Sequence, residues 1–147
     1  MQSALGRYQL SQINKYHKKR KNNAYKIMQT CKKFKSLIVP IIPLKYEHAF
    51  YRCYISVNKK YLLNNWNRDK IIKFLNKKNI ECNVGSCSEI YLEKSFKDKP
   101  YKPKKRLINA KLSSKNSIAF FVHHNLSKEY IQYTCKEINK LLNRISA

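Results

Sequence analysis

A short segment with a single glycine holds the residue types that most resemble a ligand site. Gly85, Ser86 and Cys87 directly follow a predicted strand at 80–84, and Tyr91 comes shortly after them. Ligands of α/β proteins often bind where strands end. One glycine does not make a phosphate-cradling loop, and no base stands at a recognisable spacing from the Cys87 thiol. These residues leave two interpretations open, a substrate-facing loop and an ordinary connector.

A pair of histidines marks the end of another predicted strand. His123 and His124 follow the apolar run at 117–122. Imidazole is the usual acid–base group near neutral pH, but no carboxylate stands at a clear spacing from either ring. We therefore expect a strand end at which one ring is packed and the other is exposed.

The cysteine pattern predicts neither a disulfide framework nor a metal site. The count is odd, and no two cysteines form the Cys-x-x-Cys spacing of zinc sites. Most of them join apolar runs, so we predict buried thiols in a reducing, cytoplasmic setting. No secretory apolar segment is visible in the first ten residues. The five positions are Cys31, Cys53, Cys82, Cys87 and Cys135.

The composition is strongly basic, with a formal net charge of +24. Such a charge is typical of nucleic-acid-binding proteins. The basic stretch at 97–106 contains Tyr101, which could stack on a base, or it is a solvated surface loop. Lysine greatly outnumbers arginine, which also fits compositional drift towards A/T-rich codons. A small nucleic-acid-binding protein therefore stays open as an alternative function.

The elements that position these residues fall into two parts. Residues 3–30 carry no proline and predict one long helix. The apolar run at 37–44 contains Pro40 and Pro43, which exclude a helix and a central strand. We therefore predict a helix and connector over 1–45, followed by a domain over 46–147.

The second part alternates between strand and helix patterns. Asn67 and Ser127 are predicted N-caps, and Asn79 is a predicted helix end in the left-handed conformation. The fold class is therefore α/β (α+β), a long N-terminal helix followed by a small α/β sandwich. The predicted elements are strands at 49–57, 80–84 and 117–122, helices at 67–79 and 128–145, a helical turn at 89–95 and a basic helix at 104–112.

Several segments in this order resemble one enzyme family. Residues 2–10 resemble its Gln-Ala-Ala-x-Gly-x-x-Gln-Leu segment, and 66–75 resemble its Arg-Asp-x-Leu-x-x-x-Leu helix. The strand and loop at 80–96 and the closing strand and helix at 118–142 also resemble it. Together they resemble the C-terminal part of a DegT/DnrJ-type pyridoxal-phosphate-dependent sugar aminotransferase. The loop at 85–91 lacks the His-Tyr-x-x-Pro-Leu-His form common in the family.

The resemblance implies a function for the intact enzyme. Enzymes of this family transfer an amino group, usually from glutamate, to a nucleotide-linked keto sugar, as homodimers acting in cell-surface polysaccharide biosynthesis. The fold implied is the small C-terminal domain of a fold-type I aminotransferase. The substrate-side loop implied is Gly85, Ser86, Cys87 and Tyr91. Pyridoxal phosphate and its Schiff-base lysine belong to a preceding domain, so we expect no cofactor binding, catalytic residue or activity in this chain alone.

Overall fold

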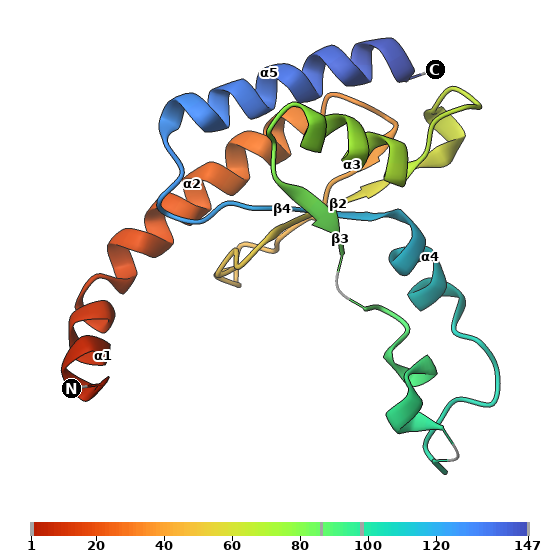
Figure 1. Ribbon diagram of the computed structural model, residues 1–147, viewed down its shortest axis with the longest axis horizontal. Helices are drawn as coiled ribbons and strands as arrows, with labels where there is room; N and C mark the ends of the chain where they lie inside the picture. The colour runs from red at the N-terminus through yellow and green to blue at the C-terminus, as the bar shows by residue number, and fades with distance from the viewer. Residues whose placement is uncertain (1, 86, 98, 147) are drawn as a thin grey trace.

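Two consecutive helices open the chain (Figure 1). The structure is a computed structural model that describes residues 2–85, 87–97 and 99–146. Helix α1 spans Gln2–Ser11 and α2 spans Ile13–Cys31. The prediction of one continuous helix is wrong at Gln12, where a turn separates the two. The Ser11 hydroxyl donates to the Tyr8 carbonyl at 2.7 Å, a bond that bends helices, and α1 has no buried residue whose packing would straighten it.

Four short strands form one antiparallel sheet in the order β1-β2-β4-β3. Strands β2 and β3 both run antiparallel to β4, which lies between them. They are therefore parallel to each other, and a parallel pair needs a crossover connection, which α3 supplies. Strand β1 lies at the edge, where the prolines that follow it are tolerated. The strands are Leu37–Ile38, Cys53–Val57, Cys82–Val84 and Ser117–Phe120.

The remaining helices connect and cover these strands. The N-caps at α3 and α5 are confirmed, because the Asn67 and Ser127 side chains accept from backbone N–H groups three residues later. The predicted basic helix at 104–112 lies four residues further on, as α4. The helices are α3 (Arg68–Lys77), α4 (Ile108–Asn116) and α5 (Lys128–Ile145), with 3-10 turns at Lys59–Tyr61, Ile90–Leu92 and Lys94–Phe96.

A backbone angle and a backbone hydrogen bond explain why two strands begin later than predicted. Phe50 has a φ of 47°, a left-handed conformation that a strand cannot contain, so β2 begins at Cys53. The Ile80 N–H donates to the Leu75 carbonyl at 3.0 Å and completes the C-terminal cap of α3. Asn79 has a φ of 56° in this cap, as predicted. Since the cap uses the Ile80 N–H, β3 begins at Cys82.

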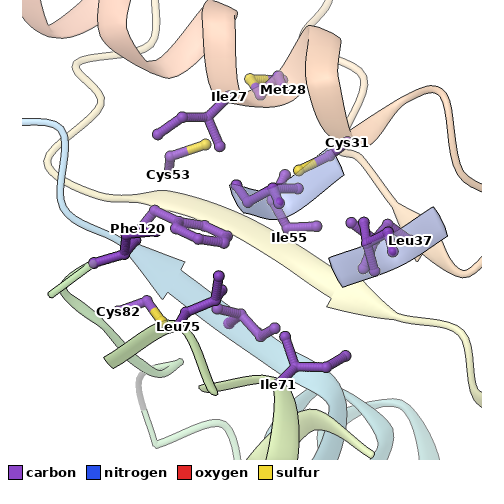
Figure 2. Close-up of a cluster of buried hydrophobic side chains, with 14 of the residues drawn as sticks. Ile27, Met28, Cys31, Leu37, Cys53, Ile55, Ile71, Leu75, Cys82 and Phe120 are labelled. Atoms are coloured by element: carbon purple, nitrogen blue, oxygen red, sulfur yellow. The ribbon is translucent and has the colours of Figure 1, made fainter. Parts of the chain in front are cut away.

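The core lies between the sheet and the helices α2, α3 and α5, which cover one of its faces (Figure 1). Figure 2 shows Ile27 and Cys31 of α2 above Ile55 of β2, with Leu75 of α3 and Phe120 of β4 in the same cluster. The mixed two-layer fold is the predicted class. The division at residue 45 stays a prediction, although β1 pairs with β2 across that boundary.

The buried thiols behave as small apolar groups. Cys31, Cys53 and Cys82 are buried in the core, as predicted. Burial raises the pKa of Cys53 and Cys82 to about 12, so both stay protonated and unreactive. Cys135 is half-buried and Cys87 is exposed.

The two glycines of the chain occupy opposite environments. A Cβ added at Gly6 would meet no heavy atom within 4 Å, whereas one added at Gly85 would lie 2.6 Å from the Ser117 Cβ. The Gly85 N–H donates to the Ser117 carbonyl at 3.1 Å. Gly85 therefore allows the chain leaving β3 to lie directly against β4.

This contrast predicts opposite effects of one substitution. Gly85→Ala forces the added methyl group against Ser117, and we expect it to lower the free energy of unfolding by about 1–3 kcal/mol. Gly6→Ala is the matched control, with an expected change between none and a gain of about 1 kcal/mol. Urea unfolding followed by circular dichroism measures both. Equal effects of the two substitutions would contradict this account.

Candidate functional site

The segment between β3 and α4 extends away from the helical layer (Figure 1). It contains the loop that the sequence singled out. Of the four predicted residues, Gly85 lies against β4, Cys87 is exposed and Tyr91 is buried. Ser86 lies outside the described residues. The structure therefore gives three of the predicted residues different surroundings.

The Cys87 thiol lacks the environment of a nucleophile. Its Sγ donates to Oε1 of Glu93 at 3.3 Å. This hydrogen bond is the main cause that raises the pKa of Cys87 above its usual value. A reactive cysteine needs the opposite shift, towards the thiolate. The exposed thiol can contact a ligand, but its neighbours do not activate it.

Tyr91 belongs to a hydrogen-bonded group that fixes the loop. Its hydroxyl donates to Oε1 of Glu89 at 2.8 Å and accepts from the Leu107 N–H at 3.1 Å. Arg106 donates two hydrogen bonds to the same carboxylate, from Nε to Oε1 at 2.7 Å and from Nη2 to Oε2 at 2.8 Å. Such bidentate pairs combine strength with fixed geometry. We call Glu89, Tyr91 and Arg106 the loop lock.

Glu89 and Arg106 were not predicted from the sequence. The chain has only eight acidic residues, and Glu89 precedes the apolar Ile90 and the aromatic Tyr91. A carboxylate that is buried beside such residues needs a cation as its partner. From this requirement, an ion pair at Glu89 could have been predicted. Its partner lies 17 residues away in a run of basic residues, so the sequence could not identify which cation it would be.

A polar cleft lies beside the loop. Alternation along β2 sends Ile55 to the helical layer and Tyr54 and Ser56 to the opposite face. There the chain encloses a cavity of about 320 Å³. We call it the serine cleft; its lining residues are Ile38, Pro40, Tyr54, Ser56, Ser88, Ser113 and Ser117. They come from four separate stretches of the chain, which no sequence pattern links.

Three of the cleft hydroxyls form a chain. Ser88 Oγ donates to Ser113 Oγ at 3.2 Å. Ser113 Oγ lies 3.4 Å from Ser117 Oγ, which donates to the Ser113 carbonyl at 2.7 Å. The chain ties the loop, α4 and β4 together, so the cleft has defined walls.

The histidine pair is not arranged for acid–base catalysis. The His124 ring stacks on Tyr16 of α2 at 3.8 Å between ring centroids. Partial burial, aided by the charge of Arg20, lowers the pKa of His124. The carbonyl of His123 accepts from the Asn23 amide at 3.3 Å. Both residues join the end of β4 to α2, and no ion pair among the described residues links them to a carboxylate.

The lysines do not fit the aldehyde cofactor that the family resemblance implies. A Schiff-base lysine needs a desolvated pocket or a cationic neighbour that activates its amine. Among the described residues no lysine is buried, so these residues do not fit pyridoxal phosphate. No group of three or more His, Cys, Asp or Glu suited to a metal ion occurs over the same residues. None of the helices described is long and apolar enough to cross a membrane.

The loop lock predicts a specific acid sensitivity. The Arg106 guanidinium holds the pKa of the Glu89 carboxyl at about 2, below its ordinary value of 4.5. A lowered folded-state pKa stabilises the fold above the unfolded value, and this contribution is lost as pH falls through the folded value. Glu89→Gln should therefore lower stability near neutral pH, and its difference from wild type should shrink between pH 4.5 and about 2.

Urea midpoints measured from pH 2 to pH 7 test the loop lock, with Glu81→Gln at an exposed carboxylate as the control. We expect the difference from wild type to depend more strongly on pH for Glu89→Gln than for this control. If the difference between Glu89→Gln and wild type did not change with pH, the ion pair of the Glu89 carboxylate with Arg106 would not be the source of its stabilising effect.

Comparison with known proteins identifies the fold. The model of the DegT/DnrJ/EryC1/StrS aminotransferase family matches residues 1–139. An aminotransferase from Psychrobacter cryohalolentis is 34% identical over 98% of this chain and 38% of its own, with a TM-score of 0.91. No curated protein matches the sequence.

More distant structures share the fold alone. The sugar aminotransferase CalS13 from Micromonospora echinospora is 12% identical over 89% of this chain and 32% of its own, with a TM-score of 0.73. An E. coli GDP-4-keto-6-deoxy-D-mannose-3-dehydratase with bound hydrated PLP is 20% identical over 90% of this chain and 33% of its own, with a TM-score of 0.75. This chain therefore spans about a third of the length of the structures it matches, and it belongs to the DegT/DnrJ/EryC1/StrS aminotransferase family.

Proposed function

We propose that this chain forms the small domain of a sugar aminotransferase, together with the helices that lead into it. In the intact enzyme an amino acid, glutamate in our proposal, gives its amino group to a nucleotide-linked keto sugar. Pyridoxal phosphate supplies the amine-carrying chemistry when bound to the rest of the enzyme. The observation that supports this most strongly is the 34% identity to an aminotransferase over 98% of the chain.

The exposed apolar residues fit a domain that packs against another. On α1, Leu5 is 61% exposed and Leu10 is 66% exposed, and in the connector Ile41 reaches 89%. Exposed apolar side chains of this kind fit surfaces that pack against another part of a protein. We propose that the remainder of the enzyme covers it, in a homodimer that works in the cytoplasm, where free thiols persist.

The chain's own contribution is to bind and orient substrate. The segment from Gly85 to Tyr91 borders the open face of the sheet, and the loop lock holds it in place. Fixed geometry at a substrate-facing loop lowers the entropy cost of reaching the reactive arrangement. Since no described lysine is buried, we expect no amino transfer by this chain alone.

A chimera tests the proposal. This chain replaces the matching segment of the Psychrobacter cryohalolentis aminotransferase, whose fold agrees with a TM-score of 0.91. We expect the chimera to fold, bind pyridoxal phosphate and transfer an amino group to a keto-sugar nucleotide. The chain alone, mixed with the same cofactor and substrates, is the control and should be inactive. A folded, cofactor-loaded chimera without amino transfer would refute the proposal.

One observation favours nucleic-acid binding as a second candidate function. A groove of about 680 Å³ runs between α2 and α5, and four lysines line it with amides and a hydroxyl. Lysine and amide groups are common phosphate contacts. One of these lysines already has a partner, because Lys140 pairs with Glu137 at 3.0 Å. The four lysines are Lys26, Lys33, Lys136 and Lys140.

Two variants of equal charge separate these functions. The first changes the four groove lysines to Gln, and the second changes Lys18, Lys19, Lys59 and Lys60, which are exposed elsewhere. If the charge has no dedicated partner, both variants weaken binding of a labelled DNA duplex equally. A nucleic-acid site in the groove requires a larger loss in the first variant and a salt slope smaller by about 0.9 per lost contact. Fluorescence anisotropy at several salt concentrations measures both, and we expect equal losses.

A further inference from the structure

The serine cleft combines hydroxyl groups with apolar surface and excludes charge. Ser56, Ser113 and Ser117 supply hydroxyls, while Ile38 and Pro40 supply apolar surface. The described residues that line it include no Asp, Glu, Lys, Arg or His. In a chain with a net charge of +24, this lining favours a neutral ligand over an anion.

The kind of ligand follows from the lining. Serine hydroxyls both donate and accept, so they match a ligand that carries hydroxyls of its own. Tyr54 and Pro40 offer flat apolar surfaces for the carbon face of a ring. A diphosphate would need cations for charge-assisted hydrogen bonds, and the described residues of the lining include none. The volume of about 320 Å³ lies at the small end of ligand sites, roughly 300–1,000 Å³, which suits one ring.

We propose that the serine cleft binds the hexose ring of the nucleotide sugar, with the diphosphate outside it. This inference rests on the proposed function and deepens it by assigning part of the substrate to named residues. The nucleotide base is a poorer fit, because no side-chain amide or carboxylate among the described lining residues could pair with its edge. Ser56, on the open face of the sheet, and Ser113 of α4 would set specificity for the sugar.

The cleft is held rigid by contacts on three sides. Ser56 and Ser117 lie on β2 and β4, whose backbones pair directly. The close approach of Gly85 to Ser117 sets the position of the loop. The loop lock then fixes the far side of that loop through Arg106. Rigid walls of this kind reduce the entropy lost on binding a small ligand.

Saturation-transfer NMR on the full chain tests the assignment, with UDP-glucose as the probe. We expect saturation to be strongest on the glucose ring protons, and methyl glucoside to compete with the signal while UDP does not. Ser56→Val and Ser113→Ala each remove one cleft hydroxyl and should weaken glucose binding about threefold to tenfold. Ser95→Ala, at an exposed serine outside the cleft, is the control and should leave binding unchanged.

Other outcomes overturn the assignment. Saturation centred on the uracil protons would place the nucleoside in the cleft instead of the hexose. Absence of binding, or equal binding by Ser56→Val and Ser95→Ala with folds verified by circular dichroism, would show that the cleft is not the sugar site.

The chimera separates this inference from the proposed function. Within an active chimera, Ser56→Val should raise the KM for the sugar nucleotide about threefold to tenfold, with the KM for glutamate unchanged. An active chimera that Ser56→Val does not affect refutes the cleft assignment alone. A folded, inactive chimera refutes the proposed function, while the NMR measurement still decides whether the cleft binds a sugar.

Discussion

The fold depends on covering the apolar inner face of a very small sheet. Ile55 and Ile118 are register partners on β2 and β4, and both are 1% exposed. Strands of two to five residues cannot hold together by their own ladder bonds, because a small sheet needs a packed apolar face. The helices α2, α3 and α5 provide that packing from three separate parts of the chain. Burial of this single face therefore links the start, middle and end of the sequence.

Concentrating the helices on one side leaves the other face for a different use. Side chains alternate along β2. The strand that buries Ile55 against the helices therefore presents Tyr54 and Ser56 to the opposite side. The loop after β3 and helix α4 border that side and form the serine cleft with it. Gly85 lets the chain leaving β3 lie directly against Ser117 of β4, since an added Cβ would lie 2.6 Å from the Ser117 Cβ.

Few of the described charged side chains in this basic chain take part in ion pairs that hold the fold together. The Glu89–Arg106 pair is one of few ion pairs among the described residues, and Glu89 is buried. The pair ties the loop at Glu89 and Tyr91 to the residues just before α4, because the Leu107 N–H also donates to the Tyr91 hydroxyl. Most lysines lie on the solvent-exposed surface, where they influence solubility and association more than the fold.

Residue types and their spacing were enough to predict most local elements and the family. The caps at Asn67 and Ser127 and the left-handed Asn79 depend on neighbouring residues, so local patterns predicted them correctly. The break at Gln12 and the late start of β2 and β3 depend on hydrogen bonds and backbone angles that residue types do not encode reliably. Which side chains meet depends on how the elements pack together. The partner of Glu89, the neighbour of Gly85 and the hydroxyls of the serine cleft come from elements far apart in the chain, and packing of the sheet against its helices brings them together.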